Sequence, residues 1–125
     1  MKVHHIAITV HDLNKSIQFY SKYFNFKLVI EFEKKELQGK AALLQLEEFH
    51  LELWQFPNST QSNNLDSLSV IGIRHLAFEV NDCEKEVKRL TQLGLTFSEV
   101  KQGVSCKKYA FTNDPSGIPI ELYQK

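Results

Sequence analysis

The stretches HHIAITVHD, residues 4–12, and RHLAFEVND, residues 74–82, open the two halves of the chain with one shared pattern. In each, a histidine begins a run in which large apolar residues alternate with other residues, and an aspartate closes the run. Such alternation predicts a β-strand with one buried face. An aspartate directly after the strand predicts a helix N-cap. Each half is therefore expected to begin with a strand followed by a helix.

The likeness of these two stretches extends along the chain as an internal repeat. A shift of 70 positions places His5 on His75. After the predicted helices the shift becomes 69, and Leu-Glu-Leu at 51–53 falls on Ile-Glu-Leu at 120–122. A first helix about one residue longer than the second accounts for the difference. A repeat of this kind indicates two copies of one supersecondary unit.

Each half is predicted to hold a strand, a helix and three further strands, which makes it a βαβββ module. The elements are expected at 3–10, 12–24, 27–34, 40–46 and 49–56 in the first half, and at 72–80, 82–93, 96–101, 107–113 and 118–124 in the second. Asn25 and Gly94, which tolerate left-handed backbone geometry, are expected to end the helices. NDPSG, residues 113–117, predicts the turn between the last two strands. The fold class is α+β.

The domain organisation follows from the repeat and from one polar segment. The modules are expected at 1–56 and 70–125 of a single domain that spans 1–125. The segment PNSTQSNNLDSLS, residues 57–69, is rich in Pro, Asn and Ser and is expected to link the modules.

Composition excludes several classes of partner. The chain has 15 Lys and Arg against 15 Asp and Glu, so it carries no excess charge for nucleic acid or an anionic membrane surface. It has neither an apolar run of the roughly 18 residues that suggest a membrane span nor a signal-peptide pattern. A cytoplasmic protein is expected, and its two cysteines are expected to stay reduced.

Strand alternation decides which polar side chains share a face. Successive residues of a strand point to opposite sides, so the large apolar residues of 6–10 should pack beneath the helix while His5 projects from the other side. By the same rule Glu52, His75 and Glu121 project from the faces that the helices do not cover. Two imidazoles and two carboxylates are therefore expected on the open side of the fold.

Two imidazoles and two carboxylates together suit a divalent transition metal, with Zn, Ni, Co, Mn and Fe as the candidates. Such a metal acts as a Lewis acid, and a carboxylate that leaves it can serve as a base. The alternative is that each residue is an ordinary hydrogen-bonded strand residue. Repetition favours the metal, because the His-to-Glu pairing occurs twice, 47 residues apart in the first half and 46 in the second.

Other residues are candidates for binding a substrate. Trp54 and Tyr123 follow the two glutamates at the same strand parity and are expected to line a small-molecule cavity. His50 shares the parity of Glu52 and is a further candidate for a substrate contact or for supporting a ligand. Lys107 could bind an anionic substrate group or be a solvated surface lysine.

Three more side chains are not assigned to the site. His4 has the opposite parity to His5 and is expected at the rim. Cys83 lies on the apolar stripe of the second helix and is expected to be an inert core residue. Cys106 could be exposed, but the pattern places no histidine beside it, so a nucleophilic role has little support.

Three long stretches carry a family resemblance. They are HHIAITVHDLNKSIQFYSKYFNF (4–26), IRHLAFEVNDCEKEVKRLTQLG (73–94) and FTNDPSGIPIELYQ (111–124). Together they resemble the vicinal oxygen chelate superfamily of glyoxalases, bleomycin-resistance proteins and dioxygenases. The resemblance implies two βαβββ modules in a cup-shaped, mostly antiparallel eight-stranded sheet, with helices on the convex face and a divalent metal within.

The resemblance also implies a site. In the metal-dependent lyases and isomerases of the family, the ligands come from the positions matched here by His5, Glu52, His75 and Glu121. A glyoxalase-like lyase or isomerase would act on a small carbonyl or hemithioacetal substrate through a metal-stabilised enediolate. Glu121, and after it Glu52, is then the expected proton-transferring base.

Several alternatives stay open under this resemblance. A thiol cofactor is implied by glyoxalase I, although this chain has only two arginines, Arg74 and Arg89, to hold the carboxylates of glutathione. A metal-free protein that binds a small molecule such as an antibiotic is the main alternative, and an iron-dependent dioxygenase is a third. A homodimer is expected on family grounds, with the site within one chain or shared between two.

Overall fold

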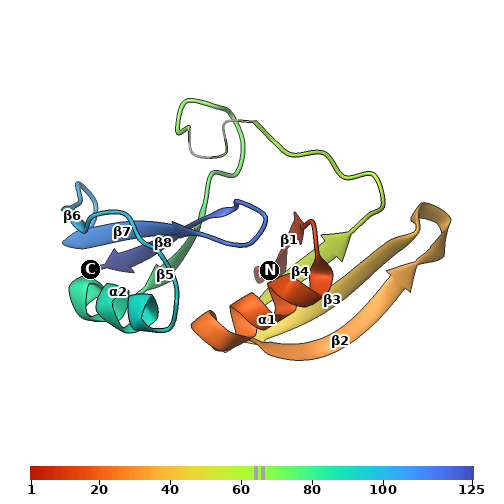
Figure 1. Cartoon of the computed structure of the whole chain (residues 1–125), viewed down its shortest axis with the longest axis horizontal. Helices are drawn as coiled ribbons and strands as arrows, with labels where there is room; N and C mark the ends of the chain where they lie inside the picture. Colours follow the sequence, from red (N-terminus) through yellow and green to blue (C-terminus); the bar gives the residue numbers. More distant parts are fainter. Residues whose placement is uncertain (64, 66) are drawn as a thin grey trace. The chain divides into compact units, whose positions relative to one another are not determined.

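The computed structural model describes residues 1–63, 65 and 67–125, so Asn64 and Asp66 of the expected linker lie outside the described residues. The chain forms two compact units, Met1–Gln61 and Ser62–Lys125. Each unit has one α-helix and one mixed four-stranded sheet among its described residues (Figure 1). The α+β class and the two βαβββ modules are confirmed. No helix in the described parts of the chain has the length and apolar character needed to cross a membrane.

The first unit builds its sheet in the order β1-β4-β3-β2. Its elements are β1 (His5–Thr9), α1 (Leu13–Phe24), β2 (Lys27–Lys34), the 3-10 helix η1 (Lys35–Leu37), β3 (Gly39–Leu46) and β4 (Phe49–Gln55). β1 pairs in parallel with β4, and the other two pairings are antiparallel. α1 packs on β3 and β4 and covers one face of this sheet (Figure 1).

The second unit repeats this topology in the order β5-β8-β7-β6. Its elements are β5 (Leu76–Glu79), α2 (Cys83–Gln92), β6 (Lys101–Gln102), β7 (Lys108–Asn113) and β8 (Pro119–Gln124). β5 pairs in parallel with β8, and α2 packs on β7 and β8. The first and last strands of each module are therefore neighbours although some 40 residues separate them in sequence.

The predicted helix boundaries are confirmed at both N-termini. Asp12 accepts a hydrogen bond from the backbone N–H of Lys15 at 3.0 Å, and Asp82 accepts one from Lys85 at 3.1 Å. These bonds satisfy amides that would otherwise lack a partner in the first turn. Asn25 ends α1 in the left-handed conformation, with φ of 59°.

Burial confirms the predicted faces of the strands. Leu51 and Leu53 of β4 are fully buried beneath α1, and Ile120 and Leu122 of β8 are equally buried on the helix side of the second sheet. The residues between them, Glu52 among them, are partly exposed on the opposite face. Hydrophobic burial against the helices therefore orients the polar side chains of the same strands.

The predicted strand 96–101 is wrong in its extent, because β6 covers only Lys101–Gln102. The preceding residues run beside β7 but are joined to it by one backbone hydrogen bond and by two bonds that involve side-chain hydroxyls. Ser98 donates its backbone N–H to the Phe111 carbonyl, whereas the Phe111 N–H is bound by the Ser98 hydroxyl. The Thr112 hydroxyl likewise donates to the Thr96 carbonyl. Side-chain oxygens thus replace the backbone ladder that defines a strand.

The predicted turn at 113–117 is confirmed and is built around Asp114. One carboxylate oxygen of Asp114 accepts hydrogen bonds from the N–H groups of Ser116, at 2.8 Å, and Ile118, at 2.9 Å. Asp114 is 4% exposed, and Gly117 takes a positive φ of 82° to complete the turn. The turn fixes the start of β8 and so the register of Glu121.

We predict that Asp114→Ala lowers the free energy of unfolding by about 2–4 kcal/mol, because two amides lose their shared acceptor. Urea denaturation measures the loss. Asp114→Asn keeps a side-chain oxygen and should lose less than half as much. Equal losses in the two variants would contradict the assignment of the effect to these hydrogen bonds.

Candidate functional site

The first His–Glu pair lies on the uncovered face of the first sheet. The register of the parallel strands places Ala7 opposite Glu52, so His5 and Glu52 project from the same side of adjacent strands. His5 Nε2 lies 4.0 Å from Glu52 Oε2, and the two side chains are 40% and 20% exposed. Both remain accessible to a ligand.

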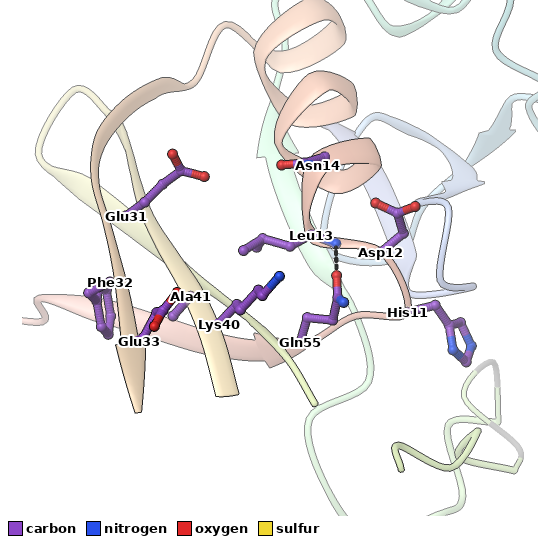
Figure 2. Close-up of a pocket in the computed structure, with 10 residues that line it drawn as sticks. All are labelled: His11, Asp12, Leu13, Asn14, Glu31, Phe32, Glu33, Lys40, Ala41 and Gln55. Carbon is purple, nitrogen blue, oxygen red and sulfur yellow. Dashed lines mark hydrogen bonds between the residues drawn. The ribbon is translucent and has the colours of Figure 1, made fainter. Parts of the chain in front are cut away.

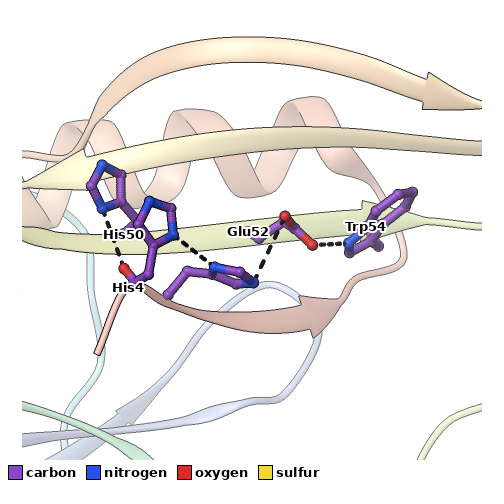
Figure 3. A network of polar contacts seen from close by, with 5 residues as sticks. His4, His50, Glu52 and Trp54 are labelled. Carbon is purple, nitrogen blue, oxygen red and sulfur yellow. Dashed lines mark hydrogen bonds and ion pairs between the residues drawn. The ribbon is translucent and has the colours of Figure 1, made fainter. Parts of the chain in front are cut away.

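A network of polar contacts extends from this pair (Figure 3). The indole N–H of Trp54 donates to Glu52 Oε1 at 2.5 Å. The Nδ1 atoms of His5 and His4 are 2.8 Å apart, so one of these two rings donates to the other. His4 in turn stacks on His50 with ring centroids 4.6 Å apart, and His50 Nδ1 donates to the His4 carbonyl at 3.2 Å. His5 and Glu52 are therefore each hydrogen-bonded to a residue outside the pair.

The second His–Glu pair occupies the equivalent place in the second unit. His75 directly precedes β5, and Glu121 of β8 lies opposite Ala77. His75 Nε2 is 3.1 Å from Glu121 Oε2, and the side chains are 28% and 14% exposed. The ring of Phe111 contacts His75 edge to face at 5.3 Å. The two units thus present the same pair at repeat-related positions.

The spacing of each pair fits chelation of a divalent metal. Two donors that share one ion at about 2.1 Å each lie at most about 4.2 Å apart. The pairs, at 4.0 Å and 3.1 Å, are within this limit. Each pair consists of one imidazole nitrogen and one carboxylate, donor types that suit Zn, Ni, Co, Mn or Fe. Within residues 1–63, 65 and 67–125, no cluster of three or more His, Cys, Asp or Glu is arranged to hold a metal.

The remaining sequence-predicted binding residues have differing surroundings. His50 and Trp54 lie on β4 within the network of the first pair. Tyr123 shares the parity of Glu121, but its hydroxyl donates to the Ser105 carbonyl at 2.6 Å. Lys107 is exposed ahead of β7.

Sequence reasoning did not predict these contacts. The bond from Trp54 to Glu52 could have been foreseen, because residues i and i+2 of a strand share a face. The contact between His4 and His5 could not, because the alternation rule places neighbours on opposite sides. It arises because β1 begins at His5 and leaves His4 outside the strand.

A cavity in each unit adjoins these elements. One, of about 540 Å³, has Gln55 and Leu13 in its lining (Figure 2). Gln55 accepts a hydrogen bond there from the N–H of Leu13 at the start of α1, so this cavity lies on the helix side of the first sheet. The other, of about 230 Å³, lies beside His75 and is lined mainly by apolar side chains, including Phe111 and Leu68.

Comparison with known proteins decides the family. A family model described as Glyoxalase/Bleomycin resistance protein/Dioxygenase superfamily matches residues 2–122. The chain belongs to this superfamily. The crystal structure of a glyoxalase family protein from Enterococcus faecalis has the same fold, with a TM-score of 0.85 and 25% identity over 98% of this chain and 96% of that one.

Two curated relatives match almost the whole chain. The protein YaeR of Escherichia coli strain K12 is 31% identical over 126 residues, which cover 99% of this chain and 96% of YaeR. A lactoylglutathione lyase of Escherichia coli O157:H7 is 28% identical over 134 residues, which cover 100% of this chain and 93% of the lyase.

The two cysteines are free thiols with different surroundings. Cys83 is fully buried, and its thiol contacts the Leu122 carbonyl at 3.9 Å. Burial, and after it the negative charge of Asp82, raises the pKa of the Cys83 thiol. Cys106 is partly exposed. The expected inert role of Cys83 agrees with these surroundings, because the thiolate is the reactive form of cysteine.

We predict that an aromatic disulfide reagent labels Cys106 in the folded protein at pH 8 and leaves Cys83 unmodified. Cys106→Ser should abolish the fast reaction, whereas Cys83→Ser should leave it unchanged. Both thiols should react once the chain is unfolded in guanidinium. A fast reaction in native Cys106→Ser would contradict the protection of Cys83.

Proposed function

We propose that the chain is a divalent-metal-dependent lyase or isomerase of the glyoxalase type, with His5, Glu52, His75 and Glu121 as the metal ligands. The observation that carries this proposal is the recurrence of one His–Glu pair in both units, at distances that permit chelation. In both units the pair lies on the face that the helix leaves uncovered, where a ligand can reach it. The similarity to a lactoylglutathione lyase supports the same class.

When bound, the metal would supply a Lewis acid that polarises the oxygen atoms of a substrate. The chain itself supplies the base. For a hemithioacetal substrate, Glu121 takes the proton from the carbon that bears the hydroxyl and returns it to the neighbouring carbonyl carbon. The hydroxyl proton moves between the two oxygens, so Glu121 ends as the carboxylate it began as.

The surroundings of the two pairs favour a small substrate with an apolar substituent. The cavity of about 230 Å³ beside His75 has a mainly apolar lining and can receive such a group. Trp54 and Tyr123 add aromatic surface on the same faces as the glutamates. His50 and Lys107 are the polar groups that we assign to the periphery of the substrate.

The thiol partner of a hemithioacetal is proposed to be other than glutathione. Arg89 is paired with Glu86 along α2. Arg74 donates to the carbonyls of Gly72 and Ser67. Both arginines are thus engaged in local contacts, which leaves no arginine uncommitted for bidentate pairing with the two carboxylates of glutathione.

A metal-free binding protein for an apolar small molecule is the second candidate. The apolar cavity beside His75 favours it, because such a cavity binds a ligand without any metal. Metal content separates the two candidates. An iron-dependent dioxygenase, the third, would instead consume oxygen after loading with iron. A homodimer is proposed on family likeness alone, and light scattering after size exclusion tests it.

We predict that the purified chain binds Ni, Co, Zn or Mn ions in stoichiometric amount. His5→Ala and His75→Ala should each weaken binding by more than the roughly 10–100-fold that loss of a supporting residue costs. Calorimetric titration of the metal-free protein measures the change. His11→Ala is the matched control, because His11 is bonded to Gln61 and belongs to neither pair. Wild-type protein that binds none of these ions would overturn the proposal.

We further predict that Glu121→Gln lowers kcat for isomerisation of a methylglyoxal hemithioacetal by about 10²–10⁴-fold, because an amide cannot accept the proton. Thioester formation should be followed with several thiols. The variant should still bind metal. Unchanged kcat in a metal-loaded Glu121→Gln protein would rule out Glu121 as the base.

A further inference from the structure

Glu52 and Glu121 occupy equivalent strand positions in the repeat, but their carboxylates have different hydrogen-bond partners. Glu52 binds the Trp54 indole N–H through Oε1 and faces His5 through Oε2. Tyr123 stands where the repeat places the counterpart of Trp54, but it donates to the Ser105 carbonyl instead. Among the described residues, the carboxylate of Glu121 contacts His75 alone.

We propose that Trp54 is a positioning residue, which fixes Glu52 as a permanent metal ligand and leaves Glu121 as the mobile carboxylate. This inference rests on the proposed function. A hydrogen bond to Oε1 restricts rotation of the carboxylate and directs Oε2 towards His5. An indole N–H is a donor only, so it can hold a carboxylate oxygen but cannot take a proton from it. Among the described residues Glu121 has no such donor, so its carboxylate is less restrained and could leave the metal and return.

Trp54 can act in this way because its own ring is immobilised. Phe56 stacks parallel to it at 5.5 Å, with an angle of 4° between the planes, and Phe32 meets it edge to face at 5.3 Å. The Trp54 backbone carbonyl accepts from the N–H of Val10 at 2.7 Å. A donor on a packed ring loses little freedom when it bonds, and its direction is fixed before any metal binds.

A glycine makes room for this stack. A Cβ atom at Gly39 would stand 2.6 Å from Cε1 of Phe56, which is closer than van der Waals contact permits. Gly39 is the first residue of β3, beside the hairpin that joins β2 to β3. The absence of a side chain at this position lets Phe56 lie flat against the indole.

The first experiment observes the indole N–H directly. Trp54 is the only tryptophan of the chain, so a ¹H–¹⁵N spectrum contains one indole signal. In the metal-free chain, Glu52→Ala should move this signal and speed its exchange with solvent by roughly 10–100-fold, because a charged acceptor is lost. Glu121→Ala should leave it unchanged. An indole signal unaltered by Glu52→Ala overturns the proposal, and this measurement needs no variant of Trp54.

The second experiment measures affinity for Ni²⁺ or Co²⁺ by calorimetry. Trp54→Phe keeps an aromatic ring but removes the donor, and it should weaken binding by roughly 10–100-fold. Tyr123→Phe removes the hydroxyl of the residue at the equivalent position in the second unit. Phe56→Leu removes the ring stacked on Trp54 but keeps the indole. Tyr123→Phe should leave metal affinity unchanged, and Phe56→Leu should reduce it by less than Trp54→Phe. Wild-type affinity in Trp54→Phe overturns the proposal.

The asymmetry between the glutamates is tested with the same titration. Loss of a fixed ligand should cost more affinity than loss of a mobile one, so Glu52→Ala should bind at least about tenfold more weakly than Glu121→Ala. Equal losses, or the reverse order, overturn the assignment of roles. A wild-type chain that binds no metal refutes the proposed function itself, whereas the exchange of the indole proton still decides whether Trp54 holds Glu52.

Discussion

Parallel pairing of the first and last strands of each module is the constraint on which the candidate site depends. A parallel connection needs an intervening crossover, and here the helix and two strands provide it. Because the paired strands come from opposite ends of the module, they bring together a histidine and a glutamate that are far apart in sequence. Burial of Leu51 and Leu53, or of Ile120 and Leu122, then sets which face each glutamate occupies.

Much of the fold could be predicted because local and global preferences agree. The aspartate caps, the alternating strands and the NDPSG turn each depend on a few neighbouring residues, and the repeat supplied two independent readings of every element. The short extent of β6 could not be predicted. Thr96 is a good strand residue, and only the tertiary contact with β7 decides that the Thr96 carbonyl and the Ser98 hydroxyl bind side-chain and backbone partners there.

For the candidate site, the sequence predicts which residues share a face but not how they contact one another. Parity identifies His5 and Glu52 as neighbours, but it gives neither the distance between them nor the donors that surround them. The stack of His4 on His50 depends on where β1 begins, which is a boundary that sequence patterns place only to within a few residues. The repeat even misleads here, since it suggests equivalence where Trp54 and Tyr123 bond to different partners.

Gly39 influences the position of Glu52 although it lies outside the proposed ligand set. A side chain there would displace Phe56, and through Phe56 the indole that binds Glu52. The geometry of one donor oxygen is thus coupled to a glycine at the start of another strand, beside a solvent-facing hairpin. Exchange of Gly39 would therefore alter the proposed metal centre through a residue outside it, while all four proposed donors are preserved.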